Sequence, residues 1–138
     1  MKFTRNAAAR WNGSGKDGKG FLTTESTVLN QTPYSYSKRF ESEPGTNPEE
    51  LIAAAHAGCF TMQLSFLLGA EGFHGQNLET VAKVTFEDGS IPFIHLDLKA
   101  AVEGISGEKF LEIATKAKEI CPVSKLLNAQ ITLTAQLS

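Results

Sequence analysis

The sequence contains two cysteines, and they are its residues with the clearest capacity for redox or nucleophilic chemistry. Cys59 lies inside an uncharged, helix-forming run over residues 51–68. Cys121 immediately precedes Pro122, at a break between two helix-like segments. One thiol within a helix and one at a proline-marked joint suggest an attacking and a resolving pair. What surrounds each thiol decides whether that interpretation holds.

Cys59 has two interpretations on its own residues. Its helix predicts that it faces the interior, on a stripe with Leu51, Ala55, Met62 and Phe66. Burial raises the pKa of a thiol, so reactivity requires a nearby cation. Without that cation, Cys59 is an inert buried cysteine. Arg39 is a candidate cation, but its position beside Lys38 equally fits a solvated charge that protects a sheet edge.

Cys121 has a different setting. A residue before proline disfavours helical geometry, and Pro122 suits the start of the next helix. Cys121 is therefore expected at a helix N-terminus, where the helix dipole favours a thiolate. We expect it to be accessible and mobile enough to meet a second sulfur. The alternative is a joint residue that only packs on its neighbours.

His56 precedes Cys59 by three residues and lies on a neighbouring face of the same helix. A Cys/His dyad for acyl transfer, or a partial zinc site with Cys121, is conceivable. A structural zinc site needs four ligands in close pairs, and His74 and His95 are far from both cysteines in sequence. We therefore predict a packed core histidine and no metal.

Composition limits the possible partners. The chain has 138 residues, 41% hydrophobic and 20% charged, which fits one soluble domain over residues 1–138. A net charge of −2 gives no reason to expect nucleic acid or a membrane surface as partner. Residues 51–70 lack formal charge, but their polar residues and acidic lead-in favour a core helix over a membrane span. No signal peptide is visible, so we expect a reducing cytoplasm without a permanent disulfide.

The remaining pattern predicts an α+β fold. A glycine-rich loop at 13–18 resembles a GxGxxG string, but a strand follows it, so it is a hairpin loop and not a phosphate cradle. Asn47 and Pro48 mark the start of the central helix, which ends near Leu68. The other predicted elements are strands or extended segments at 3–11, 20–29, 33–40, 77–87, 91–103 and 130–137, and helices at 108–120 and 122–127.

Three blocks closely resemble the OsmC (osmotically inducible protein C) family of thiol peroxidases. They are RFE at 39–41, GTNPEELIAAAHAGCFTM at 45–62 and CPVSK at 121–125, and the match extends over essentially the whole chain. The related organic hydroperoxide resistance (Ohr) branch carries an arginine in the first glycine turn. Here that turn holds Lys16 and the arginine is Arg39, which is similar to the OsmC branch.

The resemblance implies antiparallel sheets around a long buried central helix, in an intertwined homodimer. It implies a two-cysteine peroxidase for organic hydroperoxides, with hydrogen peroxide a poorer substrate and no metal, flavin or haem. Cys59 would attack the O–O bond and become a sulfenic acid, and Cys121 would condense with it to a disulfide. A dithiol, typically a dihydrolipoyl group on a protein, would reduce the disulfide. Arg39 would hold Cys59 as a thiolate and orient the peroxide, and Glu49 would orient Arg39.

Helix geometry adds a constraint to that assignment. Glu49 and Cys59 are ten residues apart, so one continuous helix separates them by about 15 Å along its axis. If both serve one site, Glu49 and with it Arg39 come from a second subunit. Neighbouring Glu50 is an alternative partner for Arg39. The rival functions are a non-enzymatic module that binds lipids or thiols, and a Cys59/His56 hydrolase.

Overall fold

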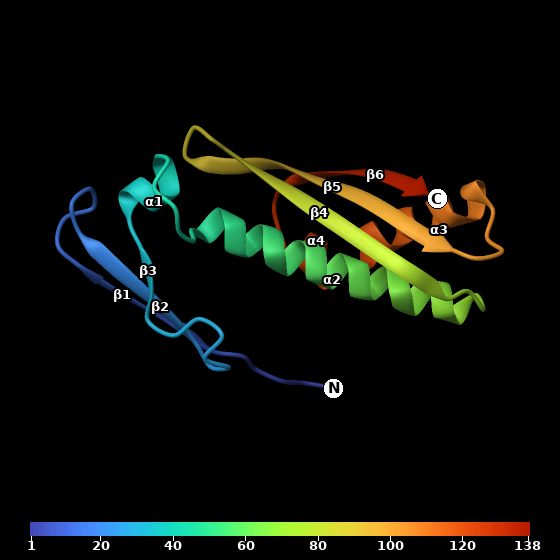
Figure 1. The fold of residues 1–138 in the computed structure, drawn as a ribbon, viewed down its shortest axis with the longest axis horizontal. Helices are drawn as coiled ribbons and strands as arrows, with labels where there is room; N and C mark the ends of the chain where they lie inside the picture. The colour runs from blue at the N-terminus through green and yellow to red at the C-terminus, as the bar shows by residue number, and fades with distance from the viewer. The chain divides into compact units, whose positions relative to one another are not determined.

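The computed structural model describes all 138 residues, and they form two compact units, Met1–Leu51 and Ile52–Ser138. Each unit contains a three-stranded sheet, and a long helix, α2 (Pro48–Ala70), begins in the first unit and continues through the second (Figure 1). The predicted α+β class is confirmed. That the whole chain acts as a single domain stays a prediction.

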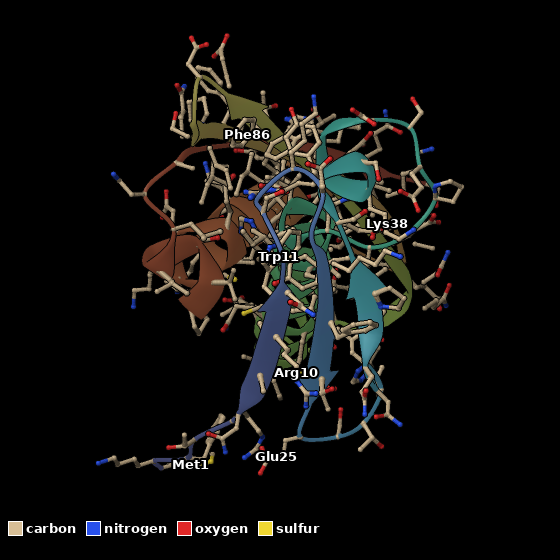
Figure 2. All side chains as sticks on the ribbon, turned by 90° about the vertical axis from the view of Figure 1, so that its left-hand side faces the viewer. Met1, Arg10, Trp11, Glu25, Lys38 and Phe86 are labelled. Carbon is tan, nitrogen blue, oxygen red and sulfur yellow. The ribbon has the colours of Figure 1, made fainter.

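The first unit is built on an antiparallel sheet in the order β1 (Ala7–Asn12), β2 (Lys19–Thr24) and β3 (Thr32–Tyr34). The glycine-rich residues between β1 and β2 form the predicted hairpin loop. Figure 2 shows Arg10 and Trp11 following one another on β1. The indole N–H of Trp11 donates to the Ser14 carbonyl at 3.1 Å and so closes the loop.

The predicted extended segment at 33–40 is wrong over most of its length. After β3 the chain forms a short helix, α1 (Tyr36–Phe40). Ser35 caps it, because its hydroxyl accepts the Lys38 N–H at 3.2 Å. The rings of Tyr36 and Phe40, one turn apart, lie against each other with centroids at 5.0 Å and planes tilted by 50°. The serine cap and the aromatic spacing were the signals for this helix.

The start of α2 agrees with the sequence. The side-chain oxygen of Asn47 accepts the Glu50 N–H at 2.8 Å, and Pro48 occupies the first helical position. The helix ends at Ala70, two residues beyond the predicted end.

The second unit holds the sheet order β4 (Gly75–Glu87), β5 (Ser90–Val102) and β6 (Gln130–Leu137). The β4–β5 hairpin is antiparallel, as expected, but β6 runs parallel to β5, and this one pairing departs from the expected antiparallel sheets. The reason is the connection, because α3 (Gly107–Ile120) and α4 (Pro122–Leu126) lie between β5 and β6 and form a crossover.

The core of the second unit lies between one face of this sheet and the helices (Figure 1). Alternate residues of β5 are buried, as are every fourth residue of α2 and the apolar side of α3. The larger buried side chains are Ile94, Leu96 and Leu98 from β5, Phe60, Leu64 and Leu68 from α2, and Phe110 and Ile113 from α3.

The α2 helix is buried along one face, and this face differs from the expected one. Its buried stripe runs through His56, Phe60, Leu64 and Leu68, whereas the expected stripe members Met62 and Phe66 are 63% and 69% exposed. Because the segment is apolar nearly all round, periodicity could not select the face. The helix is long and apolar enough to cross a membrane by length and composition, a test that a core helix also passes.

The close packing at the first sheet predicts the effect of a single methyl group. A Cβ at Gly20 would overlap the rings of Trp11 and Tyr34, which lie against each other with centroids 5.3 Å apart. We expect Gly20→Ala to lower the free energy of unfolding by about 1–3 kcal/mol and to change Trp11 fluorescence. Gly15→Ala is the matched control, since its Cβ would meet nothing within 4 Å. Equal stability of the two variants in urea would contradict this packing.

Candidate functional site

The two thiols meet in the second unit. Cys59 projects from α2, Cys121 lies at the joint between α3 and α4, and their sulfurs are 3.1 Å apart as free thiols. A disulfide needs an S–S distance near 2.05 Å, so the sulfurs must close by about 1 Å. The two cysteines, 62 residues apart in the chain, are thus positioned for direct reaction with each other.

Cys121 is neither accessible nor loosely held, contrary to expectation. Its side chain is fully buried. Its backbone N–H donates to the Ala117 carbonyl at 3.0 Å and so ends α3, while its carbonyl accepts the Lys125 N–H at 3.0 Å and so begins α4. Pro122 breaks the helix as predicted, but two helices share Cys121 as a cap, and this fixes the residue from both sides.

Cys59 is half-buried, and its surroundings in this unit oppose ionisation. Burial raises the pKa of its thiol, and the hydrogen bond with Cys121 raises it further. The backbone N–H of Val123 acts the other way, because it hydrogen-bonds to Cys59 and lowers the pKa. None of these groups carries a positive charge. A nucleophilic Cys59 therefore needs a cation besides these groups.

His56 is a packed core histidine, as predicted. Its side chain is fully buried, and Nε2 lies 2.7 Å from the hydroxyl oxygen of Ser124 on α4. Nδ1 is buried without a partner. Burial lowers the pKa of His56, so the imidazole is neutral at pH 7. The hydrogen-bonding nitrogen of His56, Nε2, is thus directed at Ser124.

Arg39 and Glu49 form an ion pair in the first unit. The Arg39 Nη2 lies 2.6 Å from Glu49 Oε1, and its Nε lies 3.1 Å from both carboxylate oxygens. This contact selects Glu49 over Glu50 as the partner of Arg39. The hydrogen bond to Arg39 lowers the pKa of Glu49, and the same bond raises that of Arg39. The pair is a preformed, fork-like arrangement of a guanidinium on a carboxylate.

The loop between α1 and α2 holds this pair in place. Lys38, also labelled in Figure 2, bonds Glu43 at 2.5 Å and the Pro44 carbonyl at 2.9 Å. The Asn47 amide donates to the Lys38 carbonyl at 3.4 Å. These contacts fix the last turn of α1, which carries Arg39, against the first turn of α2.

Comparison with known proteins identifies the family of this chain. The family model described as OsmC-like protein matches residues 40–136. Peroxiredoxin OsmC of Escherichia coli strain K12 is 48% identical over 99% of this chain and 99% of its own length. The chain belongs to the OsmC-like family.

Solved structures give the same fold for this OsmC-like protein. The crystal structure of the organic hydroperoxide resistance protein OhrB of Bacillus subtilis has a TM-score of 0.67 at 25% identity and covers 99% of this chain and 98% of its own. An OsmC-like protein from Mycoplasma pneumoniae has a TM-score of 0.78 at 14% identity, with 99% of both chains covered, and shows the fold alone.

Two groups near the thiols of the OsmC-like protein were missed by sequence reasoning. They are the Val123 N–H, which reaches Cys59, and the Ser124 hydroxyl, which reaches His56. Both residues lie in the short helix that follows Cys121. Their closeness to Cys121 in the sequence was the signal that could have identified them. No cluster of three or more His, Cys, Asp or Glu side chains is arranged to hold a metal ion, and both nitrogens of His95 hydrogen-bond to threonine hydroxyls.

The burial of His56 predicts a pH dependence of stability. Because its folded pKa is lowered, the unfolded chain binds more protons below the ordinary value of about 6.5. We expect the free energy of unfolding of the reduced protein to fall as pH drops from 7 to 5, by at most about 1.4 kcal/mol per pH unit from this group. The lowered pKa of Glu49 decreases the free energy of unfolding only as the pH falls below about 4.3.

Urea unfolding at several pH values measures this slope. His56→Phe should flatten it, whereas His74→Gln, at an exposed histidine, should leave it unchanged. An unaltered slope in His56→Phe would contradict a neutral, buried imidazole.

Proposed function

We propose that this OsmC-like protein is a thiol peroxidase that reduces organic hydroperoxides and protects against oxidative stress. The 3.1 Å approach of Cys59 and Cys121 is the observation that carries the proposal, since it places a second thiol where a sulfenic acid would form. The relatives support it by name, as a peroxiredoxin and as organic hydroperoxide resistance proteins.

The reaction proceeds in two steps. The Cys59 thiolate attacks the O–O bond of the hydroperoxide and becomes a sulfenic acid, while the leaving alkoxide takes a proton and departs as an alcohol. Cys121 then attacks the Cys59 sulfur, and the disulfide forms with loss of water. An external dithiol, such as a dihydrolipoyl group on a protein, restores both thiols by exchange. This cycle uses sulfur alone and needs no metal, flavin or haem.

Arg39 supplies the missing positive charge. A guanidinium beside Cys59 would lower its thiol pKa and hold the peroxide oxygens, and Glu49 would fix the orientation of that guanidinium. Glu49 and Cys59 both lie on the continuous helix α2, about 15 Å apart along its axis. One chain therefore does not complete the site, and we infer a homodimer in which Arg39 and Glu49 of one chain serve Cys59 of the other.

The setting of the cysteines favours this cycle over its rivals. A Cys59/His56 hydrolase needs the imidazole directed at the thiol, whereas Nε2 of His56 faces Ser124. A binding module with inert cysteines would not need its two thiols in contact. We propose that the enzyme works in the reducing cytoplasm and that residues 1–138 form one OsmC-like domain in each subunit.

Substitution of each cysteine tests the proposal. With cumene hydroperoxide and a dithiol, Cys59→Ser should lose at least about 10³-fold of the turnover, because a serine hydroxyl is not oxidised by the peroxide. Cys121→Ser should still consume about one equivalent of peroxide and then hold a sulfenic acid that dimedone labels.

The rivals give other results. Neither a binding module nor a hydrolase turns over the peroxide in any form. The acyl-transfer activity of a hydrolase would survive loss of Cys121 but not of His56. Equal turnover in wild-type protein and Cys59→Ser would overturn the proposal.

Mixed dimers test the shared site. Arg39→Ala and Cys59→Ser are each expected to be inactive, but exchange of their subunits should restore activity, because the mixed dimer joins an intact Cys59 to the other chain's Arg39. Random pairing of equal amounts should give about a quarter of wild-type activity.

The control is the Arg39→Ala/Cys59→Ser double variant mixed with wild-type protein. In a shared-site dimer both sites of that mixed dimer are dead, whereas sites within one chain would keep one alive. The second mixture should therefore keep about a quarter of wild-type activity if the site is shared, and about half if each site lies within one chain. No recovery in the first mixture, together with about half of the activity in the second, would show that each site belongs to one chain.

A further inference from the structure

A second polar contact joins the same two segments that carry the cysteines. Cys59 on α2 meets Cys121 at the α3–α4 joint, and His56 on α2 meets Ser124 on α4. His56 lies three residues before Cys59, and Ser124 lies three residues after Cys121. The two contacts therefore join the same two segments of the chain at neighbouring positions. A displacement of Ser124 away from His56 would therefore also move Cys121 away from Cys59.

The short helix α4 needs such a tether. It has five residues, its N-cap residue Cys121 makes no side-chain capping bond, and Pro122 has no N–H to donate. The contact of Ser124 with His56 is the side-chain hydrogen bond from α4 to α2, at 2.7 Å. It therefore limits how far α4 and the attached Cys121 move away from α2.

The buried imidazole of His56 is better suited to orienting α4 than to filling space in the core. It is the buried polar residue of the core, fully covered, with one nitrogen bound to Ser124 and the other unpaired. An apolar side chain of similar size would fill the same space without the cost of burying two polar nitrogens. What the imidazole adds at this position is a directional bond to α4.

We propose that His56 is a positioning residue, which acts through Ser124 to hold Cys121 in register for attack on oxidised Cys59. This inference rests on the proposed peroxidase cycle, in which Cys121 displaces hydroxide from the Cys59 sulfenic acid and the oxygen leaves as water. The disulfide and the His56–Ser124 bond each order α4 against α2. Each therefore strengthens the other, and the coupling is reciprocal.

The matched control lies on the same helix. Thr61 on α2 donates its hydroxyl hydrogen to the Ala57 carbonyl, and its oxygen lies 2.7 Å from the Thr80 hydroxyl oxygen on β4, the same distance as in the His56–Ser124 contact. Thr80→Val therefore removes a hydrogen bond of the same length from α2 without touching α4. Ser124→Ala removes the bond to His56, and Ser124→Thr keeps the hydroxyl as the conservative rescue.

Two measurements test the role, and the first uses no peroxide. Equilibration with reduced and oxidised dithiothreitol gives the equilibrium constant for closing the Cys59–Cys121 disulfide. We expect it to fall about fivefold to tenfold in Ser124→Ala, as for loss of one hydrogen bond, and to stay at the wild-type value in Thr80→Val and Ser124→Thr. This measurement tests the positioning role of His56 independently of whether the protein consumes peroxide.

The second measurement is a single turnover with cumene hydroperoxide. Ser124→Ala should lengthen the lifetime of the Cys59 sulfenic acid by a similar factor, with a smaller change in the rate at which it forms. His56→Phe should behave alike, and the double variant should be no worse than either single variant, because both remove one bond. Wild-type closure in Ser124→Ala, additive losses in the double variant, or equal losses in Thr80→Val would each overturn the proposal.

Discussion

The contact between the sulfurs of Cys59 and Cys121 is the constraint on which the rest of the structure depends. Two cysteines that must form a disulfide with each other need a fixed separation, and rigid elements provide that separation here. A core helix carries one sulfur, and a residue that caps two helices carries the other. The sheet of the second unit buries the apolar faces of α2 and α3, which anchors both elements to one core.

The same burial makes the thiol pair incomplete by itself. It protects the sulfurs but raises the pKa of Cys59, and the Val123 N–H offsets this only in part. The ion pair of Arg39 and Glu49 is built separately, in the first unit, and is held there by the loop after α1. The separation of Glu49 from Cys59 along helix α2, about 15 Å, is the physical basis for proposing a shared site.

Local signals in the sequence were sufficient for much of the fold. Asn47 and Pro48 fixed the start of α2, and the amphipathic pattern of α3 predicted its range to within one residue. Non-local effects account for the errors. Which face of α2 is buried depends on the elements that pack against it. The parallel orientation of β6 depends on the crossover through α3 and α4, which no local pattern predicts. Helix α1 was missed because the Ser35 cap is weaker as a signal than the aromatic residues around it.

The candidate site was predicted in its residues more than in its geometry. Spacing placed Cys121 at a joint between helices, but it could not reveal that the joint is buried or that Ser124 meets His56. The pairing of Arg39 with Glu49 depends on a turn of the chain through Gly45, where φ is +152°. Such contacts follow from tertiary structure and are invisible to periodicity.

The most direct test of the account is the intact mass of the protein after one equivalent of cumene hydroperoxide, with peptide mapping of the product. The proposed cycle predicts a mass lower by about two hydrogens and a peptide in which Cys59 is linked to Cys121. Two free thiols after this treatment, or a stable Cys59 oxide with Cys121 still reduced in the wild-type chain, would contradict it.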